Sequence, residues 1–236
     1  MEEVIHVSVE ACRVDIIRIR DDRLYFIQFL AFDQQAQIGL FNLSCLAQAL
    51  LPLLHKVPQE GVEWAKQALG KYQPRYEQLY AKLMQAKLGL ETTMDEDPAL
   101  VQDLLGLMEA NLTDYTILFR SLAEFTNSGG SNNIRDLFMD REGFDAWGRR
   151  YAARLHKEDS NDHERHERMN KVNPKYILRN YLAEVAIRKA EDEQDYTEID
   201  TLFRLLQRPF DEQPEYAAYA GHPPAWAANI SVSCSS

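Results

Sequence analysis

Two different spacings of hydrophobic residues divide the chain. Residues 1–30 alternate apolar and polar side chains in short β-branched or aromatic runs, and Arg20–Arg23 lies between two of these runs with the composition of a turn. From about residue 42 onward, apolar residues recur every three or four positions, which is the period of an amphipathic helix. The pattern predicts a small β hairpin or three-stranded element followed by a mainly α-helical region.

Capping residues and helix breakers divide the first half of the helical region. Asn42 or Ser44 has a side chain that can cap a helix start, so we expect the first helix to begin there. Residues 60–89 follow as one long helical stretch, and Gly70 and Pro74 predict a break or kink within it.

The second half alternates helical patterns with polar connections. Pro98 follows Asp97 at a favourable helix start, because proline is tolerated in the first turn. Asn127–Asn133 contains two glycines and predicts a loop, whereas the almost wholly polar residues 157–170 predict a solvated connection or a frayed helix start. Further helices are predicted over residues 114–125, 134–156, 174–192 and 197–207, ahead of an irregular tail from Pro209.

Composition and charge exclude several classes of function. Apolar residues make up 45% and charged residues 27% of the 236 positions, which is enough apolar material for a buried core. The formal net charge of −11 opposes binding to nucleic-acid phosphates or to anionic membranes. No apolar run approaches ~20 residues and no basic, apolar leader is visible, so we expect a cytoplasmic protein without a membrane span.

Three local patterns have alternative chemical interpretations. Gly129–Ser131 is glycine-rich, but it follows a helix, so an interhelical loop is favoured over contact with phosphate. His163 and His166 can share one helix face as metal ligands, although their polar surroundings favour a solvated charge run. The acidic residues Asp95–Asp97 could bind a divalent cation, but helix capping before Pro98 is favoured.

Cysteine placement singles out one residue. Cys12, Cys45 and Cys234 form no CxxC pair and are too few for a disulfide scaffold. Cys234 lies near the C-terminus between serines, in a segment without a core pattern. A thiol in that position fits redox chemistry, or a disulfide to a partner thiol, as well as it fits a packed tail.

Motifs spread in order along residues 31–236 match one known family. They are Ala31–Gln35, Ile38–Leu43, Leu46–Leu50, Lys87–Leu90, Asp114–Thr116, Phe119–Arg120, the most specific stretch Asn173–Ala183, Arg208–Phe210, Pro223–Pro224, Trp226 and Val232–Ser236. Together they resemble the C-terminal portion of the selenoprotein O family, whose members are protein adenylyltransferases with a pseudokinase fold.

The resemblance implies a fold and an activity. It implies the helical, C-lobe-like half of a protein-kinase-like fold, with a helical C-terminal extension. The family transfers AMP from ATP to Ser, Thr or Tyr hydroxyls of proteins with Mg²⁺ or Mn²⁺, and its nucleotide- and metal-binding residues lie ahead of the stretch that begins at Ala31. No catalytic, cofactor-binding or metal residue is therefore carried onto this chain. We expect it to be inactive alone, to bind neither ATP nor a metal ion by itself, and to have protein substrates and a complementary N-terminal half as partners.

The resemblance also gives Cys234 a role and leaves residues 1–30 unexplained. Cys234 matches the family position that holds selenocysteine or cysteine, a redox residue that pairs with a thiol in the activation-loop segment. That segment should lie shortly before Ala31, and residues 1–30 do not contain it. We expect residues 1–30 to be an atypical segment, with truncation or a frameshift as the hypothesis, and residues 31–236 to be the family's helical region. The alternative function is a non-catalytic helical module that binds proteins.

Overall fold

The computed structural model describes residues 35–127 and 132–230, and every regular element in those ranges is a helix. This confirms the mainly α prediction. The β element predicted for residues 1–30 lies outside the described residues. The chain divides into two compact units, residues 1–81 and residues 82–236, and each is described by itself.

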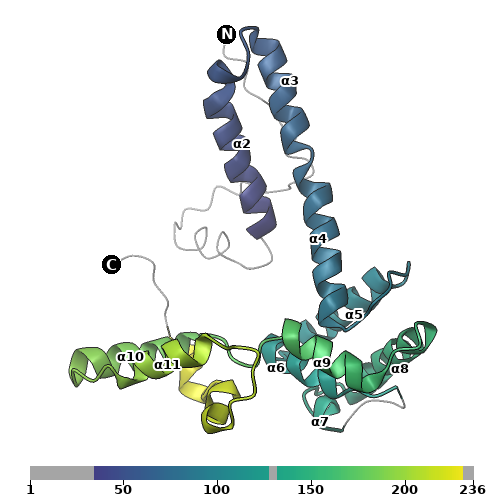
Figure 1. The fold of residues 1–236 in the computed structure, drawn as a ribbon, viewed down its shortest axis with the longest axis vertical. Coiled ribbons are helices and arrows are strands. Elements are labelled where there is room, and N and C mark those ends of the chain that lie inside the picture. Colours follow the sequence, from purple (N-terminus) through teal and green to yellow (C-terminus); the bar gives the residue numbers. More distant parts are fainter. Residues whose placement is uncertain (1–34, 128–131, 231–236) are drawn as a thin grey trace. The chain divides into compact units, whose positions relative to one another are not determined.

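The first unit contains a helical hairpin. Helix α2 (Gln35–Leu54) and helix α3 (Pro58–Leu69) lie side by side, as Figure 1 shows. The predicted start of α2 was wrong by several residues. Ser44 does not cap the helix, because its hydroxyl donates to the Leu40 carbonyl one turn earlier at 2.8 Å.

Helix α4 (Tyr72–Lys87) follows after a short break at Gly70, as predicted. The Tyr72 hydroxyl donates to the Ala36 carbonyl of α2 at 3.0 Å. A Cβ atom on Gly39 would lie 2.5 Å from that same hydroxyl, so the small residue allows the two helices to approach closely.

Helix α2 is uncharged and rich in apolar residues. It contains no Asp, Glu, Lys or Arg, and none of its residues is buried. By length and composition it is the one helix in the described part of the chain that could cross a membrane, a test that a core helix of a soluble protein also passes. The sequence analysis did not predict such a helix, because uncharged polar residues interrupt its apolar run.

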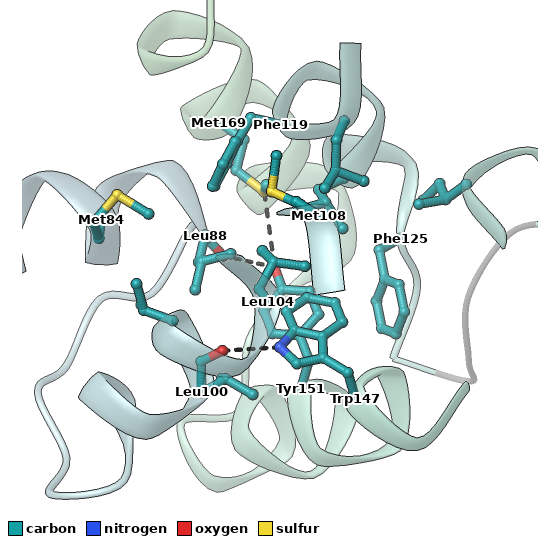
Figure 2. Close-up of a cluster of buried hydrophobic side chains, with 14 of the residues drawn as sticks. Met84, Leu88, Leu100, Leu104, Met108, Phe119, Phe125, Trp147, Tyr151 and Met169 are labelled. Carbon is teal, nitrogen blue, oxygen red and sulfur yellow. Dashed lines mark hydrogen bonds between the residues drawn. The ribbon is translucent and has the colours of Figure 1, made fainter. Parts of the chain in front are cut away.

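The second unit contains two hydrophobic clusters, a small one of Leu182, Ala186 and Leu202 and a large core formed by residues between Met84 and Met169. Its elements up to residue 172 are α5 (Asp97–Asn111), α6 (Tyr115–Ser121), a 3₁₀ turn (Leu122–Glu124), α7 (Asn132–Arg135), α8 (Arg141–Lys157) and α9 (Asp162–Val172). Figure 2 shows Trp147 and Tyr151 of α8 at the centre of this core. The Trp147 indole donates to the Leu100 carbonyl at 2.9 Å, and the Tyr151 hydroxyl donates to the Leu88 carbonyl at 2.6 Å. Both polar groups are therefore satisfied inside the core.

A glycine ends α4 beneath this core. The Leu90 N–H donates to the Gln85 carbonyl and the Gly89 N–H to the Ala86 carbonyl, which is the hydrogen-bond pattern of a Schellman motif. Gly89 has a φ of 68°, in the left-handed region. A side chain here would also collide with α9, since an added Cβ would lie 2.5 Å from Cγ of Arg165.

Two predicted boundaries in this unit were wrong. The stretch 134–156 is two helices, and Asp140 caps the second by accepting from the Gly143 N–H at 2.8 Å. Much of the stretch 157–170, predicted to be a solvated connection or a frayed helix start, is the ordered helix α9, capped by Asn161. The buried residues of α9, Arg165 and Met169, are one turn apart and face the core.

The last part of the chain forms α10 (Asn180–Asp192) and α11 (Thr197–Leu206), followed by 3₁₀ turns at Pro214–Ala220 and Ala225–Asn229. Helix α11 and the irregular tail agree with prediction. Helix α10 does not begin at Pro174, because the Lys175 and Tyr176 N–H groups both donate to the Pro209 carbonyl, at 2.8 and 3.1 Å. These two hydrogen bonds hold the segment against the tail, and the helix starts after it, at Asn180.

Candidate functional site

The family-like stretch at 173–179 is the centre of a polar cluster in the second unit. Asn173 is buried, and its side chain bonds the end of α4 twice. Its Nδ2 donates to the Lys87 carbonyl at 2.8 Å, and its Oδ1 accepts from the Lys87 Nζ at 3.2 Å. The Asn173 side chain thus links α4 to a segment more than eighty residues later.

Arg120 of α6 holds the same segment from the other side. Its guanidinium donates to the carbonyls of Asn170 and Asn173 at 2.9 and 3.0 Å, and to Glu212 at 2.7 Å. Glu212 also pairs with Lys175. Hydrogen bonds from Lys175 and then from Arg120 hold the pKa of the Glu212 carboxyl below its ordinary value, so this carboxylate stays charged.

A second ion pair fixes the far end of the segment. Arg179 donates to both carboxylate oxygens of Asp114, at 2.6 and 3.1 Å, and Asp114 caps α6 by accepting from the Ile117 N–H. Burial alone would raise the pKa of Asp114, but the hydrogen bonds from Arg179 and the Ile117 N–H outweigh it and lower the pKa. The two-point contact locks the entry into α10 against α6.

Lys87 lies at the edge of this cluster without a carboxylate partner among the described residues. Its Nζ lies over the rings of Tyr115 and Phe119, 5.4 and 5.3 Å from the ring centres. Burial lowers the pKa of the Lys87 amine. The two aromatic faces and Asn173 hold the cation in place of an ion pair.

The arrangement is suited to joining elements rather than to acid–base catalysis. The donors of Arg120 go to carbonyls and Glu212, and Asp114 is occupied by Arg179 and a helix N–H. We define residues 173–179 as the 173–179 joint. It connects α4 and α6 with the segment that leads into α10 and, through Lys175 and Glu212, with the tail.

Sequence reasoning missed two buried arginines of the second unit. Arg154 lies on the apolar side of α8 and pairs with Asp97 at 2.6 Å and with Glu158 at 2.9 Å. Asp97 therefore binds a guanidinium and makes no capping bond to its helix, which corrects the predicted capping role of this acidic run. The sequence does place Arg154 at helical spacing from Trp147 and Tyr151, on the same apolar face. A charged side chain on such a face needs a buried partner, which is the signal that could have identified this residue.

Arg165 is the second buried arginine and it is fully enclosed. Its guanidinium donates to the Phe125 carbonyl, to Asp162 at 2.7 Å and to the side chains of Asn127 and Ser160, both at 3.2 Å. These contacts order the segment that precedes residues 128–131. The polar sequence around Arg165 concealed its position, since only Met169 one turn later continues the buried face.

The two candidate histidines are placed on α9 but do not converge on one point. The His163 side chain is 82% exposed, and its nearest charged partner is Glu167 at 4.0 Å. His166 lies 3.2 Å from the Ala123 carbonyl and 2.8 Å from the Asn170 amide. No group of three or more metal-ligating side chains occurs in residues 35–127 and 132–230, so these residues do not fit a metal ion.

The remaining candidates lie outside the described residues. Cys234, the redox candidate, belongs to the segment after residue 230, and Gly129–Ser131 belongs to the gap at 128–131. Cys12 lies ahead of residue 35. Cys45 is on α2, where it is exposed and forms no disulfide.

Comparison with known proteins gives a consistent result. A family model described as "Protein adenylyltransferase SelO" matches residues 25–207. The chain is 52% identical over 206 residues to the "Protein nucleotidyltransferase YdiU" of Thioalkalivibrio sulfidiphilus, which covers 87% of this chain and 42% of that protein. Proteins of the same name from Paraburkholderia xenovorans and Thiobacillus denitrificans are 48% and 50% identical over 214 and 208 residues, each covering 87% of this chain and 41% of theirs. The chain spans about two fifths of the length of these curated relatives.

Proposed function

The chain belongs to the family of the protein adenylyltransferase SelO, and we propose that it is the C-terminal helical part of such an enzyme. The observation that carries this proposal is the family match over residues 25–207, joined to a coverage of about two fifths of the relatives' length. In this proposal the described helices correspond to a C-lobe-like platform of a pseudokinase fold. The part of the relatives that this chain does not match supplies the nucleotide site.

The proposed reaction is transfer of AMP to a protein hydroxyl. The oxygen of a Ser, Thr or Tyr side chain bonds to the α-phosphorus of ATP, the bond from that phosphorus to the bridging oxygen breaks, and pyrophosphate leaves while the hydroxyl proton is released. Mg²⁺ or Mn²⁺ would neutralise the phosphate charge in the intact enzyme. The described residues offer no grouped metal ligands, and we propose that this chain alone is inactive.

The contribution of this chain to the reaction would be positioning. Phosphoryl and nucleotidyl transfer depend on preorganised groups, so a rigid support below the nucleotide site matters for rate. The 173–179 joint supports this role, because Asn173, Arg120 and Arg179 fix three separate elements of the second unit to one another. The protein substrates and a cytoplasmic location belong to the same proposal.

Cys234 carries a separate part of the proposal. The family resemblance gives this position a redox thiol that pairs with a thiol ahead of Ala31, in the part that residues 1–30 do not match. A Cys234→Ser variant should leave the helical platform unchanged and abolish any mixed disulfide formed when the complementary part is present. Non-reducing electrophoresis of a complex with that part measures the disulfide directly.

The activity is tested by comparing this chain with a full-length fusion. The fusion joins the segment of the Thioalkalivibrio relative that precedes the matched region to residues 31–236 of this chain. Incubation with ATP labelled at the α-phosphate, Mg²⁺ or Mn²⁺ and an acceptor protein should label protein only with the fusion. Labelling by the isolated chain would contradict the proposal that it is inactive alone. A folded fusion that labels no protein would contradict the proposal that this chain is part of an active adenylyltransferase.

A non-catalytic interaction module is the second candidate function. The observation that favours it is the uncharged helix α2, which exposes large apolar side chains between Phe41 and Leu53. Binding of an unrelated protein by the isolated chain, with no gain of nucleotidyl transfer in the fusion, would favour this candidate.

A further inference from the structure

The Lys87 amine lies in a partly buried site of the second unit and has no carboxylate partner within residues 82–127 and 132–230. Its Nζ donates to Asn173 Oδ1 at 3.2 Å and lies over the rings of Tyr115 and Phe119. Other amines of this unit have a counter-charge. The pairs are Lys157 with Glu96, Lys175 with Glu212, and Lys189 with Glu198.

The surroundings of Lys87 favour the free amine more than an ion pair would. Burial removes water from the ammonium group and lowers the pKa of Lys87. The two rings favour the charged form, but neither has the net charge of a carboxylate. Lys189 shows the opposite case, because its hydrogen bond to Glu198 and the charge of that carboxylate raise its pKa. A larger share of Lys87 than of Lys189 is therefore uncharged at neutral pH.

An uncharged lysine amine is a nucleophile, and a partly desolvated one is activated for attack on carbonyl groups. Within the second unit the Lys87 amine borders Tyr115, whose side chain is 44% exposed, and Phe119, which is buried. The Tyr115 side is therefore the path for a small electrophile. Asn173 Oδ1 can accept a hydrogen bond from an ammonium group and equally from an amide N–H, so it can hold the nitrogen before and after a reaction.

The two rings select the kind of group that the amine can carry. A short uncharged acyl group such as acetyl would place its methyl group against the faces of Tyr115 and Phe119. A carbamate or a succinyl group would place a carboxylate there, and the faces of aromatic rings are negative. The site therefore suits a neutral acyl group.

We propose that Lys87 is an acylation site, at which an acyl phosphate transfers a short neutral acyl group to the amine and thereby loosens the 173–179 joint. The nitrogen lone pair attacks the carbonyl carbon and a C–N bond forms. The bond from that carbon to the phosphate oxygen breaks, inorganic phosphate leaves, and the nitrogen gives up a proton to solvent. The proposal does not depend on the function proposed above.

Loosening follows from the contacts that the charged amine makes. Acylation removes the cation from over the two rings and replaces a charge-assisted hydrogen bond to Asn173 Oδ1 by a weaker neutral one. The other bond of this side chain, from Asn173 Nδ2 to the Lys87 carbonyl, involves the backbone and is unaffected. Acylation therefore weakens one of the two bonds by which Asn173 holds the end of α4.

The first test treats the whole chain with acetyl phosphate over a range of pH and measures acetylation of each lysine by peptide mass spectrometry. Lys189 is the internal comparison, since it is also partly exposed but has a carboxylate partner. At neutral pH Lys87 should react at least about fivefold faster than Lys189, and its rate should reach half its maximum at a lower pH.

Two variants test whether the missing counter-charge is the cause. Glu198→Gln removes the charge beside Lys189 and should speed acetylation of Lys189 alone. Asn173→Asp places a carboxylate beside the Lys87 amine and should slow acetylation of Lys87 alone by at least about fivefold. Circular dichroism checks that each variant is folded. If Asn173→Asp does not fold, the comparison of Lys87 with Lys189 in the wild-type chain decides.

The second test measures the effect on the joint. Acetyl-lysine encoded in place of Lys87 should lower the melting temperature of the chain by at least about 3 °C. The same replacement at the exposed Lys171 is the matched control and should change it little.

Two results would overturn the proposal. Acetylation of Lys87 no faster than that of Lys189, or only after the chain is unfolded in urea, refutes the acylation site. Equal melting temperatures for the chains acetylated at Lys87 and at Lys171 refute the loosening of the joint.

Discussion

Gly89 gives the sharpest test of how the core of the second unit is assembled. It ends α4 in a left-handed conformation, with φ of 68°, directly beneath helix α9. A Cβ at this position would lie 2.5 Å from Cγ of Arg165 and 2.8 Å from Cγ of Met169. Both side chains are fully buried, so neither can move away freely.

The expected cost of Gly89→Ala has two parts. Placing alanine in the left-handed region costs about 1–2 kcal/mol. Forcing an extra methyl group against a packed core costs about 1–3 kcal/mol more. We therefore expect the variant to lower the free energy of unfolding of the second unit by about 2–5 kcal/mol.

Gly106→Ala is the matched control, because Gly106 lies inside α5 with no atom within 4 Å of the position of an added Cβ. The same chemical change should here stabilise the protein by about 0.5–1 kcal/mol, since alanine is the better helix former. Urea unfolding followed by the fluorescence of Trp147, with Trp64 and Trp226 replaced by Phe, reports on the core of the second unit. A stability change of the same sign at both glycines, or a neutral Gly89→Ala, would refute the reasoning.

Three further predictions concern charged and titrating groups of the second unit. Asp97→Asn weakens the buried pair with Arg154 and should lower the free energy of unfolding by about 2–4 kcal/mol. The control Asp103→Asn, in the half-exposed pair with Arg150, should lower it by less than about 1 kcal/mol. Equal losses of stability in urea unfolding would contradict the burial of Arg154. The Asp114–Arg179 pair lowers the pKa of Asp114, so its stabilisation is present above the ordinary value of 3.8 and is lost as the pH falls through the lower folded pKa. Asp114→Asn should therefore flatten the acid side of the stability–pH curve, and an unchanged acid limb would refute the pairing. Burial and the hydrogen bond to Glu198 raise the pKa of Tyr219 to about 12, so its stabilisation is present below pH 10 and is lost as the pH approaches 12. In a spectrophotometric titration, Tyr219→Phe should remove one tyrosine from the late-ionising fraction, and loss of an early-ionising one would contradict the contact.

The helical content was predictable because apolar spacing decides which face is buried. Phe144, Trp147 and Tyr151 recur at three- and four-residue intervals, and all three are buried in the core of the second unit. The start of α6 was equally visible, because Asp114 has the side chain of a helix cap and accepts from the Ile117 N–H.

The errors arose where tertiary contacts override local pattern. Pro174 has the residue type of a helix start, yet α10 begins at Asn180 because the preceding N–H groups bond the Pro209 carbonyl. The polar stretch 157–170 contains too few apolar residues to signal a buried helix face. Arg165 is buried because Asp162 and the distant Phe125 carbonyl accept hydrogen bonds from its guanidinium. The Pro209 and Phe125 carbonyls lie far along the chain, so neighbouring residues do not identify them as partners.

The candidate site was likewise predictable only in part. The resemblance identified the stretch Asn173–Ala183, and the structure places its first residues at a joint between α4 and α6. The function of the stretch as a joint could not be predicted, because Lys87, Arg120 and Glu212 come from three separate parts of the sequence. The redox role of Cys234 stays a prediction, since the residue lies outside the described part of the chain.

We propose that this chain is part of an enzyme that transfers AMP rather than phosphate. The most direct measurement incubates the full-length fusion and an acceptor protein with ATP labelled either at the α-phosphate or at the γ-phosphate. We predict that the α label becomes covalently attached to hydroxyl side chains of protein and that the γ label leaves with pyrophosphate. Attachment of the γ label to protein, with no transfer of the α label, would contradict the account.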